Sequence, residues 1–478
     1  MATPVENANG DVSTSTNGST FRVLVTGANS GLGFSLCCRL IDEFLYARPQ
    51  TQSLHLLFST RDGTKSESTM RRLREHLQST LRTANGNTLL GISVVLEARV
   101  RIEGVLVDLT RLGSVKELAE ELLGRREGGG GGGGGEGGDG ELRLDAVVWN
   151  AGVAGWRGIN WFGAVWNVLV GLKQAVTFPD YMVCDVGRRT GRQVVVQKTV
   201  EDQQKDEKKD DEEEEEEPVL GEVFTANVFG HYMLTHWLSP LLDRNSRIIW
   251  VSSTGAVHDA FNVEDIQGLQ SLVAYESSKR LTELLALTAA LPSTRPFTKT
   301  FFSSSSTSSA QGGSNDEQQQ QPRMLVTHPG VVATSISGLH WFLSIFMTIA
   351  FYLARILGSP WHAIDPYKGA VSMVFAILSP QIIELEEREG KGKWGSAANV
   401  KGDERVARTL VEGWGYCGRP GVVPPGSATT GLYAKRKETT KETREEFEEV
   451  GRRVWKEMEA MRVDWERRLG PLLVKSSR

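Results

Sequence analysis

The sequence predicts an α/β fold in which helices cover both faces of a doubly wound, mostly parallel sheet. Two observations lead to this expectation. Short apolar runs of four to six residues alternate with longer amphipathic stretches, and a glycine-rich turn joins the first run to the first stretch. Apolar residues make up 40% of the chain, enough for a sizeable core. We therefore expect a single domain with disordered insertions, although 478 residues alone would suggest about three domains.

Strands are expected where β-branched and aromatic residues form short runs that end in turn residues. These are residues 21–25, 54–58, 104–107, 144–149, 247–251 and 324–327. Helices are expected where apolar residues recur every three or four positions. These are residues 34–44, 70–81, 114–123, 223–242, 275–291 and 435–469, of which the last is charged and carries one apolar stripe. Strands and helices alternate, as a parallel sheet requires.

Four segments lack an apolar period and are expected to be disordered. Residues 1–20 are polar, 128–140 contain eleven glycines, 201–217 contain twelve acidic residues, and 303–321 are rich in Ser and Gln. The last three are low-complexity insertions in a domain expected over residues 21–400. Residues 401–478 are expected to form a C-terminal extension with the charged helix.

Charge and cysteine content exclude several classes of protein. The formal net charge is −5 and the acidic tract alone carries more than that, so neither argues for a nucleic-acid surface. The four cysteines lack the spacing of a disulfide framework or a zinc site, which fits a reducing compartment and a chain without a metal. Residues 1–20 lack the apolar centre of a secretory signal peptide.

The turn after the first strand has glycines at Gly27, Gly31 and Gly33. Such glycines let backbone N–H groups and the positive end of the next helix approach a pyrophosphate, and Ser30 and Leu32 belong to the same turn. Glycine triplets also arise by chance in a glycine-rich chain. The position between the first strand and helix is nevertheless where a Rossmann-like sheet has its dinucleotide crevice.

The second and third strands end in residues that bear on the choice of nucleotide. Arg61 stands where an acidic residue would bind the ribose 2′-hydroxyl of NAD. Its positive charge favours a 2′-phosphate, and therefore NADP, unless Arg61 is simply a solvated loop residue. Asp108 is expected either to contact the adenine edge or only to cap the following turn.

Tyr275 and Lys279 are four residues apart on one expected helix, so their side chains project into the same space. An ammonium beside a phenol is expected to lower the phenol pKa from about 10, which allows proton exchange with a carbonyl or alcohol oxygen. Ser252 and Ser253 follow a strand, and the Ser253 hydroxyl is expected to bind the same oxygen. Asn227 is expected to reach Lys279 through a water.

The motifs follow one order along the chain: the glycine turn, Asn150-Ala151-Gly152, Asn227, Ser252-Ser253, Tyr275/Lys279 and Pro329-Gly330. In this order the chain resembles the short-chain dehydrogenase/reductase family over about residues 21–334. The resemblance implies an NADP-dependent oxidoreductase acting on an alcohol or carbonyl group.

The resemblance also implies roles for individual residues. Tyr275 would be the acid/base, Lys279 would lower its pKa and hold the nicotinamide ribose, Ser253 would orient the carbonyl, and Asn227 would support a water relay. Further members of the implied cofactor site are Asn150, Val332 and Thr334. Ser253 and Tyr275 are twenty-two residues apart, farther than in shorter members of the family. Residues 258–272 are therefore expected to loop over the site, which leaves the choice between Ser252 and Ser253 open.

Within the family, the stretches 25–33, 227–232, 250–254 and 327–334 look most like those of fungal 3-keto-steroid reductases. That resemblance implies NADPH-dependent reduction of a 3-oxo sterol to the 3-hydroxy sterol in ergosterol biosynthesis, together with a sterol demethylation complex as partner. Two alternatives stay open. One is a reductase for a retinoid, fatty-acyl or secondary-metabolite carbonyl. The other is an inactive scaffold, which would be expected to lack Tyr275 or Lys279.

Two apolar segments are expected near the substrate. Residues 341–354 are mostly apolar but shorter than the roughly 20 residues that span a bilayer. Residues 156–172 contain three tryptophans, a residue type that favours membrane interfaces. Either both segments are buried core helices, or they form an apolar entrance to the substrate cleft. Such an entrance would rest on the cytosolic face of the endoplasmic reticulum or on a lipid droplet. A cytoplasmic location is the alternative.

Overall fold

The computed structural model describes residues 19–84, 91–127, 142–179, 181–193, 217–303, 321–334, 341–431 and 436–473. The disorder expected for residues 1–20, 128–140, 201–217 and 303–321 falls almost wholly outside these described residues, and it stays a prediction.

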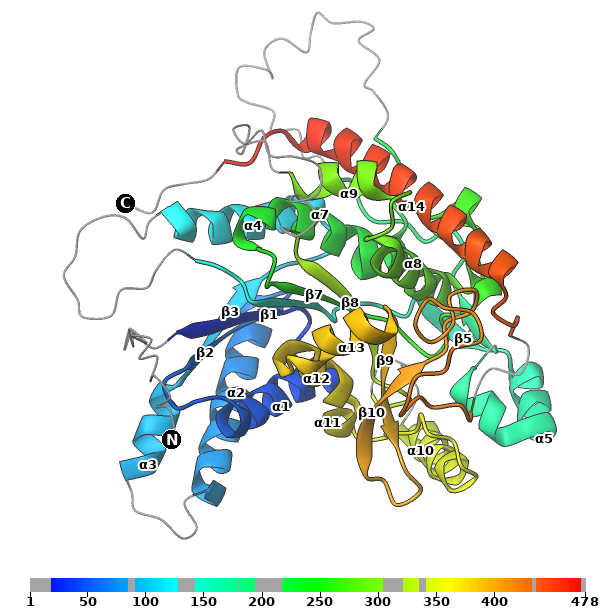
Figure 1. The fold of residues 1–478 in the computed structure, drawn as a ribbon, viewed down its shortest axis with the longest axis horizontal. Coiled ribbons are helices and arrows are strands. Elements are labelled where there is room, and N and C mark those ends of the chain that lie inside the picture. Colours follow the sequence, from blue (N-terminus) through cyan, green and yellow to red (C-terminus); the bar gives the residue numbers. More distant parts are fainter. Residues whose placement is uncertain are drawn as a thin grey trace, which may run out of the picture.

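One eight-stranded sheet runs through the described chain in the order β10-β9-β8-β7-β4-β1-β2-β3 (Figure 1). Its strands are β1 (Thr20–Val25), β2 (Ser53–Thr60), β3 (Val100–Leu106), β4 (Ala146–Trp149), β7 (Arg247–Val251), β8 (Arg323–His328), β9 (Lys393–Ala398) and β10 (Glu404–Thr409). All neighbours pair in parallel except β9 and β10. The strand order reverses direction at β1 and β4, whose carboxyl ends form the crevice of a doubly wound sheet. The expected fold class is confirmed.

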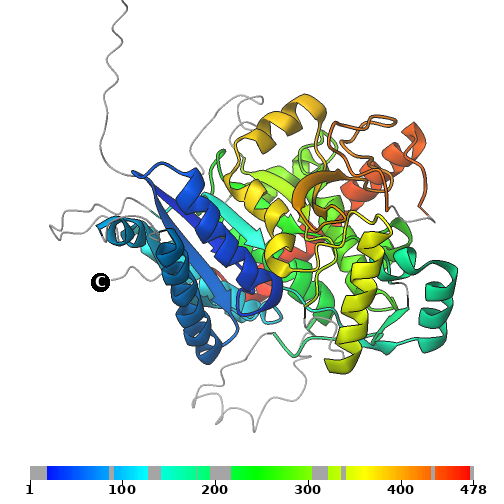
Figure 2. The same ribbon diagram turned by 90° about the horizontal axis from the view of Figure 1, so that it is seen from below.

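Helices cover both faces of the sheet (Figures 1 and 2). One face carries α1 (Gly31–Ala47), α2 (Gly63–Ala84), α11 (Pro366–Gly369), α12 (Val371–Leu378) and α13 (Gln381–Glu389). The other carries α4 (Leu112–Glu127), α6 (Glu222–Phe224), α7 (Gly230–Trp237), α8 (Ala274–Thr288), α9 (Arg295–Phe302) and α14 (Lys441–Leu469). The short helix α3 (Gly91–Ala98) precedes β3.

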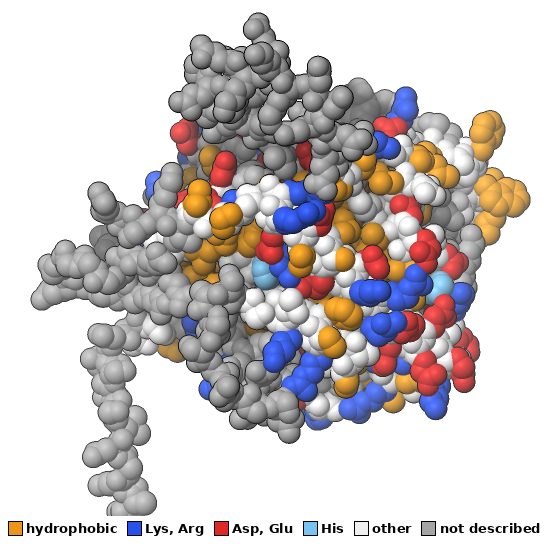
Figure 3. All heavy atoms as spheres, turned by 90° about the horizontal axis from the view of Figure 1, so that it is seen from above, with side chains coloured by type: hydrophobic (Ala, Val, Ile, Leu, Met, Phe, Trp, Pro, Cys, Tyr) orange, Lys and Arg blue, Asp and Glu red, His pale blue; other side chains and the backbone are white. Residues whose placement is uncertain are grey.

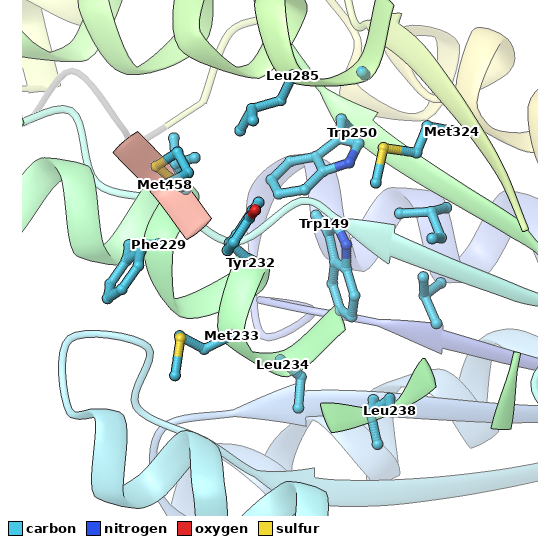
Figure 4. Packing of buried hydrophobic residues seen from close by; sticks show 14 of the residues in the cluster. Trp149, Phe229, Tyr232, Met233, Leu234, Leu238, Trp250, Leu285, Met324 and Met458 are labelled. Carbon is cyan, nitrogen blue, oxygen red and sulfur yellow. The ribbon is translucent and has the colours of Figure 1, made fainter. Parts of the chain in front are cut away.

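Aromatic side chains fill the core beneath α7, α8 and α14 (Figure 4). Trp149 and Trp250 stand on the adjacent strands β4 and β7, and both are buried. Tyr232 is also buried, and its hydroxyl donates to Glu459 of α14 over 2.7 Å. The charged C-terminal helix therefore supplies both apolar and polar partners to the central core.

The domain boundary expected at residue 400 is wrong. It falls between β9 and β10, which pair with each other and complete one edge of the sheet. Beyond this hairpin, α14 buries Phe447, Val454 and Met458 in the same cluster as α8. The residues after 400 belong to the domain because they cover apolar surface that the sheet and α8 would otherwise expose.

A small insertion lies between β4 and α6. It consists of β5 (Trp156–Ile159), α5 (Trp161–Thr177) and β6 (Met182–Cys184), with β5 and β6 paired in antiparallel fashion. Helix α10 (Trp341–Ile356) lies beside α5, as Figure 2 shows for the yellow and teal helices. In the part of the chain that the structure describes, no single helix has the length and apolar character to cross a bilayer. The pair Pro366–Leu378 and Gln381–Glu389, bent by 83°, meets that length and composition test together.

Candidate active site

A cavity of about 660 Å³ opens at the carboxyl ends of β1, β4 and β7. Part of its wall is the glycine turn, and another part consists of apolar side chains from α5 and α10. The sequence-predicted residues that line it are Gly27, Ser30, Gly31, Leu32, Gly33, Arg61, Asp108, Asn150, Ser253, Tyr275, Lys279, Val332 and Thr334. Residues spread over three hundred positions of sequence are thus brought to one place.

The glycine turn, Gly27 to Gly33, forms a cradle whose backbone is exposed to the cavity. Only glycine fits at its tightest positions, because a side chain there would be strained or would clash. Gly27 and Gly31 have φ values of +69° and +53°, in the left-handed region that favours glycine. A Cβ on Gly33 would lie 2.2 Å from the Gly27 carbonyl oxygen and 2.6 Å from Nδ2 of Asn150. Asn150 in turn donates to the carbonyl oxygen of Thr26 over 2.9 Å. The cradle and the N-terminus of α1 fit a pyrophosphate group.

Thr26 and His231 support the cradle from behind, and sequence reasoning missed both. The Thr26 hydroxyl oxygen accepts from the backbone N–H groups of Asn150 and Ala151, each over 3.1 Å. It also bonds Nε2 of His231 over 2.9 Å. Burial lowers the pKa of His231 to about 3, so its ring is neutral. The only sequence signal was the position of His231 one helical turn after Asn227.

The two residues expected to select the nucleotide line the same cavity. Arg61 is exposed and follows β2. Asp108 follows β3, and its Oδ1 accepts from the Thr110 hydroxyl over 2.7 Å and from the Thr110 N–H over 3.0 Å. Asp108 therefore does cap its turn, and its expected contact with the adenine edge stays a prediction.

Tyr275 lines the same cavity as the cradle and the apolar side chains. The Ser253 hydroxyl is a side-chain neighbour of its phenol and lowers the phenol pKa. Nζ of Lys279 stands 5.6 Å from the centre of the Tyr275 ring and donates to the Val251 carbonyl oxygen over 2.9 Å. The Trp156 ring meets the Tyr275 ring edge-on at 5.3 Å. These contacts hold the Tyr275 ring in the wall of the cavity.

The expectation that Lys279 lowers the Tyr275 pKa is wrong, because the structure raises this pKa. Burial raises the phenol pKa, the charge of Glu276 raises it further, and the hydrogen bond from Ser253 lowers it. The Lys279 ammonium is directed at a backbone carbonyl, and burial lowers its own pKa to about 8. Desolvation of the phenol thus outweighs its neighbouring hydrogen bond.

The two adjacent serines have different partners. The Ser252 hydroxyl donates to Glu283 over 2.8 Å, and Ser252 is buried. Lys393 of β9 forms an ion pair with Glu283 and donates to the carbonyl oxygen of Ser253 over 2.6 Å. The Ser253 hydroxyl oxygen instead accepts from the Gly255 N–H over 3.1 Å. Sequence reasoning missed Glu283 and Lys393 because their pairing joins helix α8 to a strand 110 residues later.

One further expectation is corrected by the structure, and another stays a prediction. The side chain of Asn227 exchanges hydrogen bonds with the backbone of Val153 and donates to the Ser278 hydroxyl over 2.9 Å, and its expected link to Lys279 through a water stays a prediction. Asn227 lies in a π-helical turn, Thr225–Phe229, which interrupts the helix expected over residues 223–242. Residues 258–272 do not line the cavity. Their Glu264 instead pairs with Arg453 of α14.

The apolar part of the cavity is built by the two segments that were expected near the substrate. Helix α5 contributes Ala164, Val168 and Val176, and α10 contributes Phe346, Met347, Ala350 and Phe351. The same helices expose apolar side chains outward, including Phe162 at 93%, Leu169 at 76%, Trp166 at 68% and Phe346 at 66%. Neither helix is therefore a buried core helix.

A glycine cradle at the switch point of a doubly wound sheet, with tyrosine, lysine and serine in the same cavity, defines an oxidoreductase of the short-chain dehydrogenase/reductase class. Comparison with named proteins of similar sequence identifies the family within this class. The 3-keto-steroid reductase of Aspergillus fumigatus is 39% identical over 463 residues, which cover 93% of this chain and 94% of that protein. The 3-keto-steroid reductase of Gibberella zeae is 38% identical over 475 residues, covering 94% of each. The chain belongs to the 3-keto-steroid reductase family.

More remote similarities extend to solved structures. L-sorbose reductase from Gluconobacter frateurii is 13% identical with a TM-score of 0.36, covering 76% of this chain and 94% of that one. A short-chain dehydrogenase/reductase from Mycobacterium ulcerans is 13% identical with a TM-score of 0.35, covering 75% and 83%. No protein-family model matches the chain.

Proposed function

We propose that the protein reduces the ketone of a 3-oxo sterol to the 3-hydroxy sterol, with NADPH as the reductant, in sterol biosynthesis. The observation that carries this proposal is one cavity that is lined by the glycine cradle, by Ser253, Tyr275 and Lys279, and by apolar side chains of α5 and α10. Membership of the 3-keto-steroid reductase family supports the same substrate class.

The residues at the cradle fit a phosphorylated dinucleotide. The glycine turn accommodates the pyrophosphate, Arg61 supplies the charge for a 2′-phosphate, and Val332 and Thr334 line the same cavity. When bound, NADPH supplies a hydride to the carbonyl carbon. Tyr275 donates its proton to the carbonyl oxygen, and the Ser253 hydroxyl stabilises the negative charge that develops there.

The apolar wall selects the substrate class. Side chains of α5, α10 and the β5–β6 hairpin surround the space beyond Tyr275, and most of them are aliphatic or aromatic. Burying a large apolar molecule there removes its surface from water, at roughly 25 cal/mol per Å². A sterol skeleton fits this chemistry, whereas a sugar or another polyol would leave its hydroxyl groups without partners.

The test is turnover with a panel of ketones. Purified full-length protein is incubated with NADPH or NADH and a 3-oxo sterol, retinal, a long-chain aliphatic ketone or a ketose, and the alcohol product is measured. We expect turnover with NADPH and the sterol ketone. Equal turnover of retinal or the aliphatic ketone would support the broader hydrophobic-carbonyl reductase, and no turnover of any ketone would contradict the proposal.

We also propose that the outer faces of α5 and α10 rest on a membrane or lipid-droplet surface. Both helices line the cavity and also expose apolar side chains: Phe162, Trp166 and Leu169 of α5 lie outside the cavity lining, and Phe346 of α10 lines the cavity and is exposed as well. Figure 3 shows apolar side chains protruding at the right-hand edge, the side on which α5 lies in Figure 1. A sterol could enter between these helices without crossing water. Other enzymes of sterol demethylation are expected to meet the chain at the same surface.

Replacing the exposed apolar side chains should release the protein from lipid. In a flotation assay with phospholipid vesicles, the variant Phe162→Ser/Trp166→Ser/Phe346→Ser is expected to bind at least about tenfold less. The reason is that each lost aromatic side chain removes about 1.5–3 kcal/mol of burial. The matched control replaces Val422, Val423 and Leu473, which are exposed elsewhere on the described chain. Equal flotation of both variants would contradict the proposed contact.

A further inference from the structure

We propose that Ile364 joins the nucleotide side of the cavity to its apolar wall, so that binding of the nucleotide favours binding of the substrate. The inference rests on the proposed function, which assigns these two sides to NADPH and to the sterol. Ile364 is not part of the cavity lining. It acts through residues that are, and it is therefore a positioning residue.

The backbone of Ile364 has a conformation that its own side chain disfavours. Its φ is +67°, the only positive value outside glycine in the part of the chain that the structure describes. β-Branched residues rarely adopt this left-handed region, because the side chain is crowded by the backbone. Such a conformation persists only where surrounding contacts hold it, and it is typical of functional sites. The contacts of Ile364 therefore indicate what the residue does.

The first set of contacts bonds the backbone of Ile364 to residues 331–333. The Ile364 N–H donates to the Val331 carbonyl oxygen over 2.9 Å, and the Ala333 N–H donates to the Ile364 carbonyl oxygen over 2.8 Å. Together they form a parallel bridge between Ile364 and Val332. The bridge fixes the course of this segment past the cavity.

The bridged segment reaches the glycine cradle. Val331, Val332 and Thr334 line the cavity. A Cβ on Gly31 would stand 3.5 Å from Cβ of Thr334, so the segment adjoins the turn that fits a pyrophosphate. Residues 331–334 are therefore the nucleotide-side segment.

The second set of contacts buries the Ile364 side chain in the apolar wall. Ile364 is 6% exposed, and it belongs to one cluster with Val176 of α5 and with Phe351 and Ala354 of α10. Val176 and Phe351 also line the cavity. The side chain of Ile364 thus packs with both helices that form the wall.

The two sets of contacts together account for an isoleucine in a strained position. A glycine would adopt the positive φ without strain, but it would leave the wall without this side chain. A large apolar side chain on this backbone joins the nucleotide-side segment to α5 and α10. A ligand that orders residues 331–334 thereby also holds the wall in the shape that receives the substrate.

The test measures how strongly one ligand favours the other, with NADP and a 3-oxo sterol as the pair. NADP has no hydride to transfer, so both bind without turnover. The Kd of the sterol is measured by tryptophan fluorescence, without NADP and with saturating NADP. In the unmodified protein the sterol is expected to bind about fivefold tighter or more when NADP is present, within the usual range of coupling between sites.

Substitutions at Ile364 should remove this effect of NADP selectively. In Ile364→Ala, which withdraws the side chain from the wall, NADP is expected to tighten sterol binding by less than about twofold. Ile364→Gly, which also relieves the positive φ, should behave in the same way and replaces the alanine variant if that variant does not fold. Ile364→Val, which keeps a β-branched apolar side chain, should retain the full effect.

The matched control is Ile382→Ala, the same truncation at a fully buried residue of α13 outside the cavity lining. Both alanine variants are expected to be less stable than the unmodified protein, because each loses buried apolar contacts. A merely structural role of Ile364 would therefore leave the effect of NADP the same in the two variants.

A second readout needs no sterol. Hydrogen exchange of the α10 backbone amides is measured by mass spectrometry with and without NADP. On adding NADP, exchange is expected to slow by about fivefold or more in the unmodified protein and in Ile382→Ala. In Ile364→Ala it should not change, because the nucleotide-side segment no longer packs on the wall.

The outcomes separate this inference from the proposed function. An equal effect of NADP in Ile364→Ala and Ile382→Ala would overturn the inference, and so would the absence of any effect of NADP on α10 in the unmodified protein. Failure of the proposed function has a different signature. The unmodified protein would then reduce no sterol ketone, while NADP would still slow exchange in α10 only where Ile364 is intact.

Discussion

Tyr275→Phe is expected to lower ketone turnover by about 10²- to 10⁴-fold, the range that a positioned general acid contributes. Phenylalanine keeps the ring that packs edge-on against Trp156 and removes only the hydroxyl. The loss should therefore appear in kcat, while the affinity for NADPH, measured by fluorescence titration, changes little. Thermal unfolding should also stay close to that of the unmodified protein.

The matched control is Tyr416→Phe, which removes a hydroxyl that bonds the Ala428 carbonyl oxygen outside the cavity. This variant should keep full turnover. If Tyr275→Phe retained more than a tenth of the activity, Tyr275 would not be the proton donor, and another acid in the cavity would have to take its place.

Glu283→Gln is expected to lower the free energy of unfolding by about 3–5 kcal/mol, the cost of leaving buried charges without a partner. Glu283 is fully buried and pairs with Lys393 through Oε1 and with Arg280 through Oε2. The amide keeps the shape of the side chain but leaves two cations uncompensated. Lys393→Met should cost less, because Glu283 then keeps its pair with Arg280.

Urea unfolding of the purified variants measures these differences. Glu264→Gln, which breaks an exposed pair with Arg453, is the control and should change the free energy of unfolding by less than about 0.5 kcal/mol. A larger loss in Lys393→Met than in Glu283→Gln would show that Glu283 does not balance both cations.

The sheet could be predicted strand by strand wherever the chain alternates between short apolar runs and amphipathic helices. β1, β2, β4, β7 and β8 lie where the runs placed them. β9 and β10 were missed because their sequences, Lys-Trp-Gly-Ser-Ala-Ala and Glu-Arg-Val-Ala-Arg-Thr, carry little of the usual β-branched content. Their strand character comes from pairing with β8 and with each other, which is tertiary information.

The candidate site was predictable where local motifs carry it. The glycine turn and the Tyr275/Lys279 spacing are local, and both line the cavity. The partners of Ser252 and the anchoring of Asn227 by Val153 and Ser278 are contacts between distant elements, so no window of sequence contains them. The sequence also could not predict that the Tyr275 pKa is raised. The four-residue spacing indicates a nearby cation, but it does not show that burial removes water from the phenol.

The bond from Lys393 to the Ser253 carbonyl has a consequence for how the protein becomes active during its synthesis. When the ribosome has synthesised the glycine turn, Tyr275 and Lys279, the active site is still incomplete. The loop that carries the serine acquires its anchor only when a strand made 140 residues later emerges and joins the sheet edge. A nascent chain therefore lacks this anchor for the Ser253 loop until β9 has left the exit tunnel.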